Sequence, residues 1–461
     1  MHEVPNPVLG NSFLEDPLPT ERIETKYRRI ITSIPVPESL DILRRGARVF
    51  PRVNCYQPPV VWDRAEGFQV YDAWGNCWID FSSTAVMANT GHGHPKIRQA
   101  LAEHIQRGLL AQFSFASEIR VRLAERLLEI APKGMEKVYF WTTGSEAVES
   151  ALRMARTYGM RRHPEKYHLI SFTEDYHGCT LGAHQLSGIS AAKPWLTHPD
   201  VAIHRLPFPS MEGTGEGTDW AAAFAADIAE CPVEPSKVAA VFIETLQGWG
   251  ALPFPAKYLQ ALRAWADQHD VLLVFDEIQT GFGRTGRWFA HEHYGVQPDL
   301  ICIGKGVTST LPLAAVLGPA QVLDLLEPGE VTTTHAAHPL ACAAAFANLE
   351  VIHNEGLLES AERTGLVIRA ELNQLQNRWP AHISNVSGLG LLNALHLCNP
   401  FTHTPDPQLA RDLTNAGVRR GVMLFQVNRP TVKICPPLVI TEEAAREGIQ
   451  ALEEALEIIT N

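Results

Sequence analysis

The run Val271-Leu-Leu-Val-Phe275 is followed directly by Asp276-Glu-Ile-Gln-Thr-Gly-Phe-Gly-Arg-Thr-Gly286. Five apolar residues in a row predict a buried strand. Two carboxylates come directly after this strand, and desolvating a carboxylate is costly unless a positive group or hydrogen-bond donors compensate for it. We therefore expect Asp276 to meet a cationic ligand group at the end of the strand.

Similar short apolar runs alternate with longer helical patterns through the middle of the chain. Tyr258, Leu262 and Trp265 recur at helical spacing, which predicts a helix that covers the sheet. Strands that alternate with helices build a mostly parallel sheet, so the sequence predicts an α/β fold. The expected strands are 138–141, 169–172, 238–243, 271–275, 300–303 and 314–317.

The pattern changes on either side of this region, which predicts a division into domains. We expect residues 1–75 to form an N-terminal arm and the start of a small domain, 76–332 to form a large domain, and 333–461 to form a small C-terminal domain. In this last part helices and short strands mix, which predicts an α+β domain. Its expected elements are helices at 341–353 and 357–375, strands near 391–397 and 432–435, and a final acidic helix.

Three of the expected strands are followed by residues that suit a ligand site, because ligands of open parallel sheets bind at the carboxyl ends of the strands. Thr142-Thr-Gly-Ser-Glu146 opens a helix, whose first N–H groups can hold an anion. Asp175-Tyr-His-Gly178 brings an aromatic ring and an imidazole to the same edge. Gly304-Lys-Gly306 places a poorly solvated lysine there, and burial lowers the pKa of a lysine toward that of a nucleophilic amine. Taken singly, these motifs could equally be a capped helix, a packed ring and a solvated lysine.

Composition argues against two classes of partner. The chain has 461 residues, of which 45% are hydrophobic, and no apolar run approaches the roughly 18 residues that a membrane span needs. The net charge is −12, and Lys and Arg are scattered rather than clustered. We therefore expect neither a membrane nor a nucleic acid as a partner.

The cysteines and the N-terminus favour a cytoplasmic protein. The eight cysteines form no CxxC pair in a chain long enough to fold without disulfides. The first residues are acidic and rich in proline, and they resemble neither a signal peptide nor a transit peptide. His92, His94, His291 and His293 lack carboxylate or thiolate partners at ligand spacing, so we expect no metal site.

Together the motifs resemble the class III aminotransferases, of fold type I, from about Val70 to the C-terminus. The resemblance is carried by Phe275-Asp-Glu-Ile-Gln-Thr-Gly-Phe-Gly-Arg-Thr-Gly286, by Gly304-Lys-Gly306 and by Pro312-Leu-Ala-Ala-Val316. It implies pyridoxal 5′-phosphate (PLP) as the cofactor. It also implies an aspartate aminotransferase-like fold, in which a large PLP-binding domain with a mostly parallel sheet flanked by helices is joined to a smaller α+β C-terminal domain.

The resemblance implies roles for individual residues. Lys305 would carry PLP as a Schiff base and would then move a proton between substrate and cofactor. Asp276 would keep the ring nitrogen protonated, so that the ring withdraws electrons. Thr334 would reach the phosphate in the neighbouring subunit, which implies a homodimer with shared sites. The other implied cofactor contacts are Gly144 and Ser145 at the phosphate, Tyr176 and Ile278 on the two ring faces, Gln279 at the phenolic oxygen, and His177 and Glu244.

Four positions bear on the substrate. Lys433 stands where members that use 2-oxoglutarate usually have an arginine, and lysine cannot make the same two-pronged contact to a carboxylate. Trp249 stands where some members carry a glutamate that masks this arginine. Arg429 is a candidate carboxylate clamp, although a solvated surface arginine is an equal alternative. Thr84 replaces a usual glycine and is expected to narrow the pocket.

We therefore expect transamination in two half-reactions, from a hydrophobic amine or ω-amine donor to a keto acid or aldehyde acceptor. The small amine and carbonyl substrates are the expected partners. Three alternatives stay open on the same fold: an amino-acid racemase or epimerase, a lyase acting on an amino-alcohol phosphate, and a relative that binds without catalysis. The presence of both Asp276 and Lys305 argues against the last of these.

Overall fold

A sheet of seven strands lies at the centre of the large part of the protein. The computed structural model describes residues 15–54, 57–189, 193–209, 217–425 and 427–460 of the chain. All neighbouring strands are parallel except at one strand, which is antiparallel to both of its neighbours. Across the sheet the order is β6 (Lys137–Trp141), β14 (Ala314–Gly318, the antiparallel strand), β13 (Leu300–Ile303), β12 (Leu272–Asp276), β9 (Val238–Glu244), β7 (His168–Phe172) and β8 (Ile203–Leu206). The predicted strands and the mostly parallel sheet are confirmed, and β8 is an additional edge strand.

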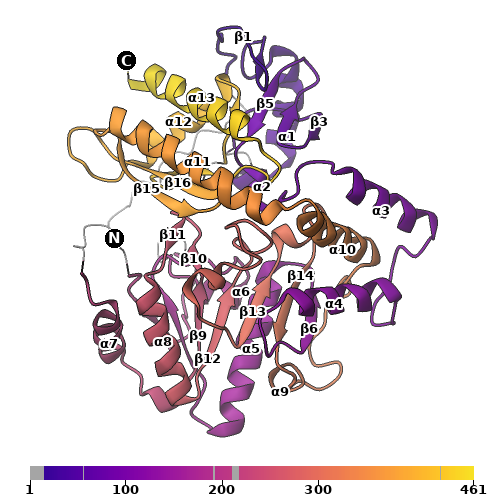
Figure 1. The fold of residues 1–461 in the computed structure, drawn as a ribbon, viewed down its shortest axis with the longest axis vertical. Coiled ribbons are helices and arrows are strands. Elements are labelled where there is room, and N and C mark those ends of the chain that lie inside the picture. The colour runs from indigo at the N-terminus through magenta and orange to yellow at the C-terminus, as the bar shows by residue number, and fades with distance from the viewer. Residues whose placement is uncertain (1–14, 55–56, 190–192, 210–216, 426, 461) are drawn as a thin grey trace.

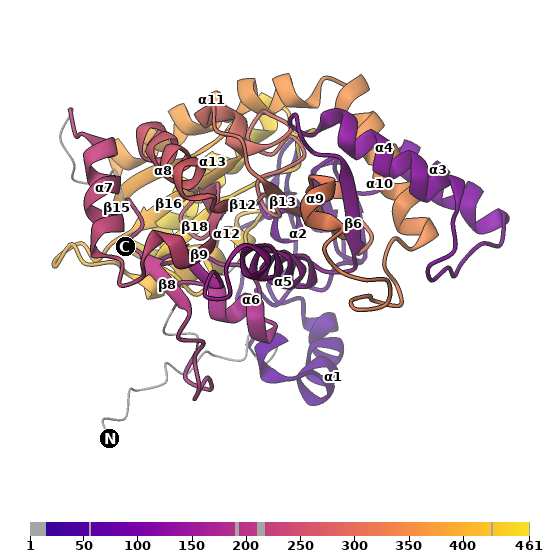
Figure 2. The ribbon, with the colours of Figure 1, turned by 90° about the horizontal axis from the view of Figure 1, so that it is seen from below.

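The side chains of β12 alternate between two buried faces of the sheet. Val274 packs in the core on the side of α5 (Gly144–Arg162), whereas Phe275 packs on the side of α8 (Ala256–His269). Figure 2 shows these two helices on opposite sides of the sheet. Because successive side chains of a strand point to opposite faces, a strand that is apolar at every position needs cover on both. The helix predicted from Tyr258, Leu262 and Trp265 is α8.

The remaining helices of this part complete the two outer layers. Among them, α10 (Pro339–Asn354) packs against α3 (Pro95–Gln106) and α4 (Glu118–Ile130). The other three are α6 (Leu181–Leu186), α7 (Trp220–Glu230) and α9 (Ala320–Leu323).

The first and last parts of the chain meet in a second region, which lies above the central sheet in Figure 1. One sheet has the order β1 (Ile23–Glu24), β2 (Arg29–Ile30), β5 (Cys77–Asp80), β4 (Gln69–Tyr71) and β3 (Arg64–Glu66), and β17 (Val422–Met423) pairs parallel to β5. A three-stranded antiparallel sheet contains β15 (Ile383–Leu389), β16 (Leu392–Leu397) and β18 (Thr431–Ile434). The α-helices of this region are α1 (Leu40–Val49), α2 (Ser83–Val86), α11 (Leu357–Arg378), α12 (Pro407–Arg419) and α13 (Glu442–Thr460). Two short strands from the middle of the chain, β10 (Leu246–Gln247) and β11 (Leu252–Pro253), pair antiparallel with each other.

The α/β fold with a C-terminal α+β part is therefore confirmed, as are the helices, strands and acidic final helix predicted after residue 333. The boundaries predicted at 75/76 and 332/333 stay a prediction. Residues 1–14 of the predicted arm, and Cys55, lie outside the described residues.

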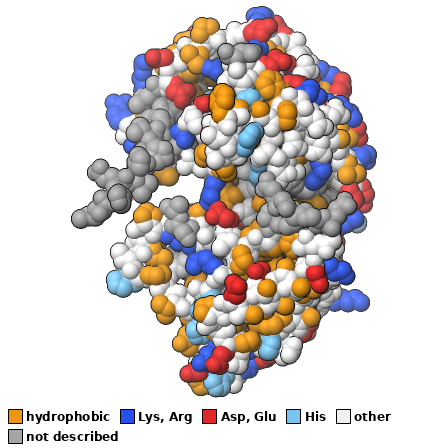
Figure 3. All heavy atoms as spheres, turned by 90° about the vertical axis from the view of Figure 1, so that its left-hand side faces the viewer, with side chains coloured by type: hydrophobic (Ala, Val, Ile, Leu, Met, Phe, Trp, Pro, Cys, Tyr) orange, Lys and Arg blue, Asp and Glu red, His pale blue; other side chains and the backbone are white. Residues whose placement is uncertain are grey.

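The surface has mixed charge on the face that Figure 3 shows, where basic and acidic side chains are scattered among neutral ones. The helices of the described ranges include none that is long and apolar enough to cross a bilayer.

Candidate functional site

A cavity opens at the carboxyl edge of the central sheet. Its walls come from the segments that follow five parallel strands, β6, β7, β9, β12 and β13. The lining residues are Thr143, Gly144, Ser145, Tyr176, His177, Gly178, Glu244, Asp276, Ile278, Gln279 and Lys305. Every cofactor contact expected from the sequence except Thr334 therefore lies around one cavity.

The start of α5 forms one wall. Thr143, rather than Ser145, is the cap of this helix: its hydroxyl accepts from the N–H of Glu146 at 3.3 Å, and the Glu146 carboxylate accepts from the N–H of Thr143 at 2.8 Å. Ser145 is thus left beside the cavity, where its hydroxyl accepts from the N–H of Cys179 at 3.3 Å. A 19-residue helix pointing its N-terminus at the cavity provides a site for an anion.

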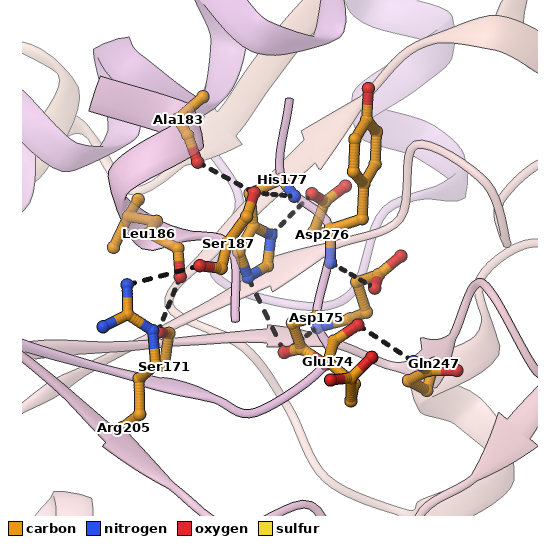
Figure 4. A network of polar contacts seen from close by, with 12 residues as sticks. Ser171, Glu174, Asp175, His177, Ala183, Leu186, Ser187, Arg205, Gln247 and Asp276 are labelled. Carbon is orange, nitrogen blue, oxygen red and sulfur yellow. Dashed lines mark hydrogen bonds and ion pairs between the residues drawn. The ribbon is translucent and has the colours of Figure 1, made fainter. Parts of the chain in front are cut away.

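His177, which lines the cavity, lies between the carboxylates of Asp175 and Asp276 (Figure 4). Its Nδ1 is 2.9 Å from Asp276 Oδ2, and its Nε2 is 3.6 Å from Asp175 Oδ2. Burial alone would lower the pKa of His177, but the hydrogen bonds and charges of Asp175 and Asp276 outweigh it and raise this pKa to about 10. The backbone N–H of His177 donates to Ser187 Oγ at 2.9 Å. A fixed, positively charged imidazole therefore holds Asp276 in place at the cavity.

Lys305 follows β13 and begins a short 3-10 helix, Lys305–Val307, with a left-handed backbone φ of +41°. Such a φ is strained in a residue other than glycine and persists where the surrounding structure enforces it. Burial lowers the pKa of Lys305 to about 8, and the positive charge of Lys433 acts in the same direction, against the charges of Asp276 and Glu244. The amine is therefore available as a neutral nucleophile close to neutral pH.

Glu244, Gln279 and Lys433 form a chain of hydrogen bonds. Glu244 Oε2 accepts from the N–H of Tyr176 at 2.7 Å, and Glu244 Oε1 accepts from Gln279 Nε2 at 3.4 Å. Lys433 Nζ donates to Gln279 Oε1 at 3.0 Å and to the carbonyl of Gly248 at 3.1 Å. Burial, and then the charge of Asp175, raise the pKa of Glu244 to about 8. Lys433 thus contacts Gln279, which lines the cavity, and is not itself among the lining residues.

The other expected substrate contacts lie near the cavity. The ring of Trp249 meets that of Tyr176 edge to face, with centroids 5.5 Å apart. The guanidinium of Arg429 is 5.4 Å from the Trp249 ring and pairs with Glu174 at 2.8 Å. Thr84 lies half-buried on α2. Thr334 is exposed in a turn before α10 and does not line the cavity of its own chain.

For three residues of the site the sequence predicted no cofactor role. Thr143 and Gly178 line the cavity, and Asp175 is the second carboxylate on His177. Gly178 has a φ of +131°, and a Cβ there would lie 2.2 Å from Ser145 Oγ, so only glycine fits. A glycine directly after Asp175-Tyr-His was the available signal for Gly178. No sequence signal linked Asp175 to His177, because their spacing does not show that the carboxylate faces the imidazole.

The donor set of the cavity suits PLP. The first turn of α5 suits a phosphate, and the Asp276 carboxylate suits a protonated ring nitrogen. The space beside Ile278 depends on a glycine, because a Cβ at Gly144 would lie 2.9 Å from Ile278 Cδ1. Lys305 supplies an amine of lowered pKa for the aldehyde.

Comparison with known proteins agrees with this chemistry. Residues 52–456 match the family model of class III aminotransferases. An alanine/serine racemase of Pyrococcus horikoshii is 33% identical, with 95% of each chain covered. A 5-aminovalerate aminotransferase of Pseudomonas putida is 34% identical, over 90% of this chain and 97% of that one. A solved structure of the ω-transaminase from Pseudomonas jessenii in complex with PMP has a TM-score of 0.81 and 26% identity, over 91% of this chain and 95% of that one.

These matches confirm the family, the fold type I architecture and PLP as the cofactor, which the sequence motifs had implied. The family model spans nearly the whole chain and contains all the residues of the cavity. The protein belongs to the class III aminotransferase family of PLP-dependent enzymes.

Proposed function

We propose that this enzyme transfers an amino group from a hydrophobic amine or ω-amine to a keto acid or aldehyde. One observation carries the proposal. The side chain at the position of the usual carboxylate-binding arginine is Lys433, and its ammonium already donates to Gln279 and to the carbonyl of Gly248. The neighbouring wall is the apolar ring of Trp249, packed on Tyr176. A donor with an apolar group suits such a wall better than a dicarboxylate does.

The residues of the cavity divide the work of this reaction. PLP, when bound, supplies the aldehyde that receives the amino group and a ring that withdraws electrons from the substrate carbon. Gly144 and Ser145 would hold its phosphate, Tyr176 and Ile278 its ring faces, Gln279 its phenolic oxygen, and Asp276 its nitrogen. Lys305 Nζ would remove the proton from the substrate carbon that bears the nitrogen and deliver it again.

A half-reaction without acceptor tests this proposal. The PLP-loaded enzyme is mixed with one amine or amino acid at a time, and the formation of PMP and of the carbonyl product is measured. We expect PMP to form with hydrophobic amines or ω-amines, Lys305→Ala to abolish its formation, and Lys257→Ala, at an exposed position on α8, to leave it unchanged. Efficient PMP formation with dicarboxylic amino acids alone would refute the proposed donor class.

Racemisation is the second candidate, favoured by the 33% identity to an alanine/serine racemase over 95% of the chain. In this reaction the proton returns to the same substrate carbon and no amino group stays on the cofactor. The discriminating measurement is therefore exchange of the α-hydrogen with deuterium from solvent. Exchange with inversion of the amino acid and without PMP would replace transamination by racemisation.

We further propose a cytoplasmic homodimer in which each chain completes the site of the other. The free thiols of the cysteines in the described ranges support a reducing compartment. Thr334, which the family resemblance assigns to the phosphate, is exposed outside the cavity of its own chain. A partner subunit would bring it to that cavity.

A further inference from the structure

Lys433 is a buried lysine whose ammonium donates to two oxygens of the protein. Only 6% of its surface is exposed. Its Nζ lies 3.0 Å from Gln279 Oε1 and 3.1 Å from the carbonyl oxygen of Gly248. Burying an ammonium is costly unless acceptors compensate, and these two oxygens do so.

The chemistry of an ammonium determines how the Gln279 amide is oriented. A lysine ammonium can only donate hydrogen bonds, so Gln279 must turn its oxygen toward Lys433. The amide nitrogen is thereby directed to Glu244 Oε1 at 3.4 Å, along the cavity that Gln279 lines. Nε2 carries two protons, and one of them is left for a group in the cavity. Without Lys433 the amide could turn over and exchange its donor for an acceptor.

The surrounding backbone leaves the amide little freedom. A Cβ at Gly248 would lie 2.2 Å from Gln279 Nε2 and 2.7 Å from Glu244 Oε1. The backbone at Gly248 thus closes directly on the amide that Lys433 holds. Gln279 is confined by Gly248, Glu244 and Lys433 together.

We propose that Lys433 is a positioning residue that fixes the Gln279 amide with its nitrogen on the cofactor side, instead of binding a substrate carboxylate. The substrate class that follows rests on the proposed function: the acceptor or donor needs no carboxylate at this position. The positioning effect does not depend on any substrate, so it can be tested separately.

The first test measures the effect on Gln279 through the affinity of the full-length protein for PMP. Lys433→Met and Gln279→Leu should each weaken PMP binding roughly tenfold, and the double variant should be no weaker than Gln279→Leu, since coupled residues are not additive. Lys433→Gln, which keeps a donor, should retain most of the affinity. Additive losses would overturn the proposal that Lys433 acts through Gln279. If Lys433→Met does not fold, as judged by circular dichroism, retained PMP affinity in Lys433→Gln supports the proposal, and a tenfold loss in folded Lys433→Gln overturns it.

The second test compares acceptors. If Lys433 binds a substrate carboxylate, Lys433→Met will raise the KM of keto acids and leave the KM of aldehydes unchanged. We expect no such selective rise, but a common fall in kcat for both kinds of acceptor. A KM effect confined to keto acids overturns the proposal even where the donor class proposed above is correct.

Discussion

At the scale of single residues, the charge of His177 makes the stability of the protein depend on pH. The pKa of this buried imidazole is about 10, above its ordinary value of 6.5. A raised pKa of the folded state means that the stabilisation is complete below pH 6.5 and is lost as the pH rises to about 10. We expect His177 to lower the free energy of unfolding of the cofactor-free protein by about 1 kcal/mol for each pH unit between 7 and 9. Above pH 8 Lys305, whose pKa is lowered to about 8, opposes this fall, because the unfolded chain then binds more protons at that lysine.

Urea unfolding of His177→Asn measures this contribution. The variant should be less stable than the parent at pH 7, and the part of the pH dependence that lies between 7 and 9 should become smaller. Glu244, whose raised pKa is about 8, changes stability in the same direction between 4.5 and 8, so some slope will remain. His403→Asn, at an exposed position, is the matched control and should keep the parent's slope. Identical slopes in parent and His177→Asn would show that Asp175 and Asp276 do not keep the imidazole charged.

Residues next to strand ends could be predicted from the sequence, and residues joined by long-range contacts could not. Asp276 and Lys305 stand directly at or after apolar strands, so their place at the sheet edge followed from local pattern. The pairing of His177 with Asp276 joins residues 99 apart, and that of Lys433 with Gln279 joins residues 154 apart. Nothing in the spacing fixes such pairs, so the contact between Lys433 and Gln279 could not be predicted.

At the scale of elements, the first turn of α5 tests the proposed phosphate site. A Cβ at Gly144 would lie 2.9 Å from Ile278 Cδ1 and 3.2 Å from Ile278 Cγ2. Gly144→Ala should therefore displace Ile278 or the helix start and weaken PLP binding by about tenfold, which equals about 1.4 kcal/mol. Equilibrium titration of cofactor-free protein with PLP measures the effect. The double variant with Ile278→Val, which lacks Cδ1, should regain much of the affinity, and Ile278→Val alone is the control.

The element α2 is a left-handed turn, which the sequence did not predict. Ser83, Thr84, Ala85 and Val86 have φ values of 44°, 50°, 62° and 66°, although none of them is glycine. The left-handed conformation costs a residue with a side chain roughly 1 kcal/mol or more, which explains why glycine is usual at the position of Thr84. The expectation from the sequence was only that Thr84 narrows the pocket.

Thr84→Gly should therefore stabilise the protein. We expect a gain of up to about 1 kcal/mol in the free energy of unfolding, because relief of the backbone exceeds the added entropy of the unfolded chain. Urea unfolding checks this result. Thr157→Gly, inside the regular helix α5, makes the same chemical change and should destabilise the protein instead. A loss of stability at both positions would mean that contacts of the Thr84 side chain outweigh its backbone strain.

At the scale of the whole molecule, the fold class could be predicted from the alternation of strands and helices. The pairing of a strand near the N-terminus with a strand near the C-terminus could not. β17 has only two residues and pairs parallel to β5, which lies more than 300 residues earlier in the chain. A two-residue strand carries no periodicity, so no local pattern could predict β17 or its partner. The same limit applies to assembly, because residues that a partner covers have the pattern of ordinary surface residues.

The surface near Thr334 nevertheless suits a second copy of this chain. Leu109, Leu110, Phe113 and Phe115 are all exposed, and Phe115 by 77%. Arg120 donates to the carbonyls of Phe113 and Phe115 and also to that of Ala336, two residues after Thr334. A copy seated on this apolar segment would therefore lie beside Thr334. We expect Phe113→Ser with Phe115→Ser to lower the mass measured by light scattering from dimer to monomer.

Mixing two inactive variants tests whether the sites are shared. Thr334→Glu should repel the phosphate of PLP in the partner's site, and Lys305→Ala should inactivate its own site. In a mixed dimer the chain with Thr334→Glu keeps its lysine and receives an intact threonine from its partner, so one of the two sites is complete. Random reassociation should therefore restore roughly a quarter of the parent's activity, since half of the dimers are mixed and each has one complete site. If Thr334 served the site of its own chain, the mixture would stay as inactive as either variant, because no chain would then carry both residues.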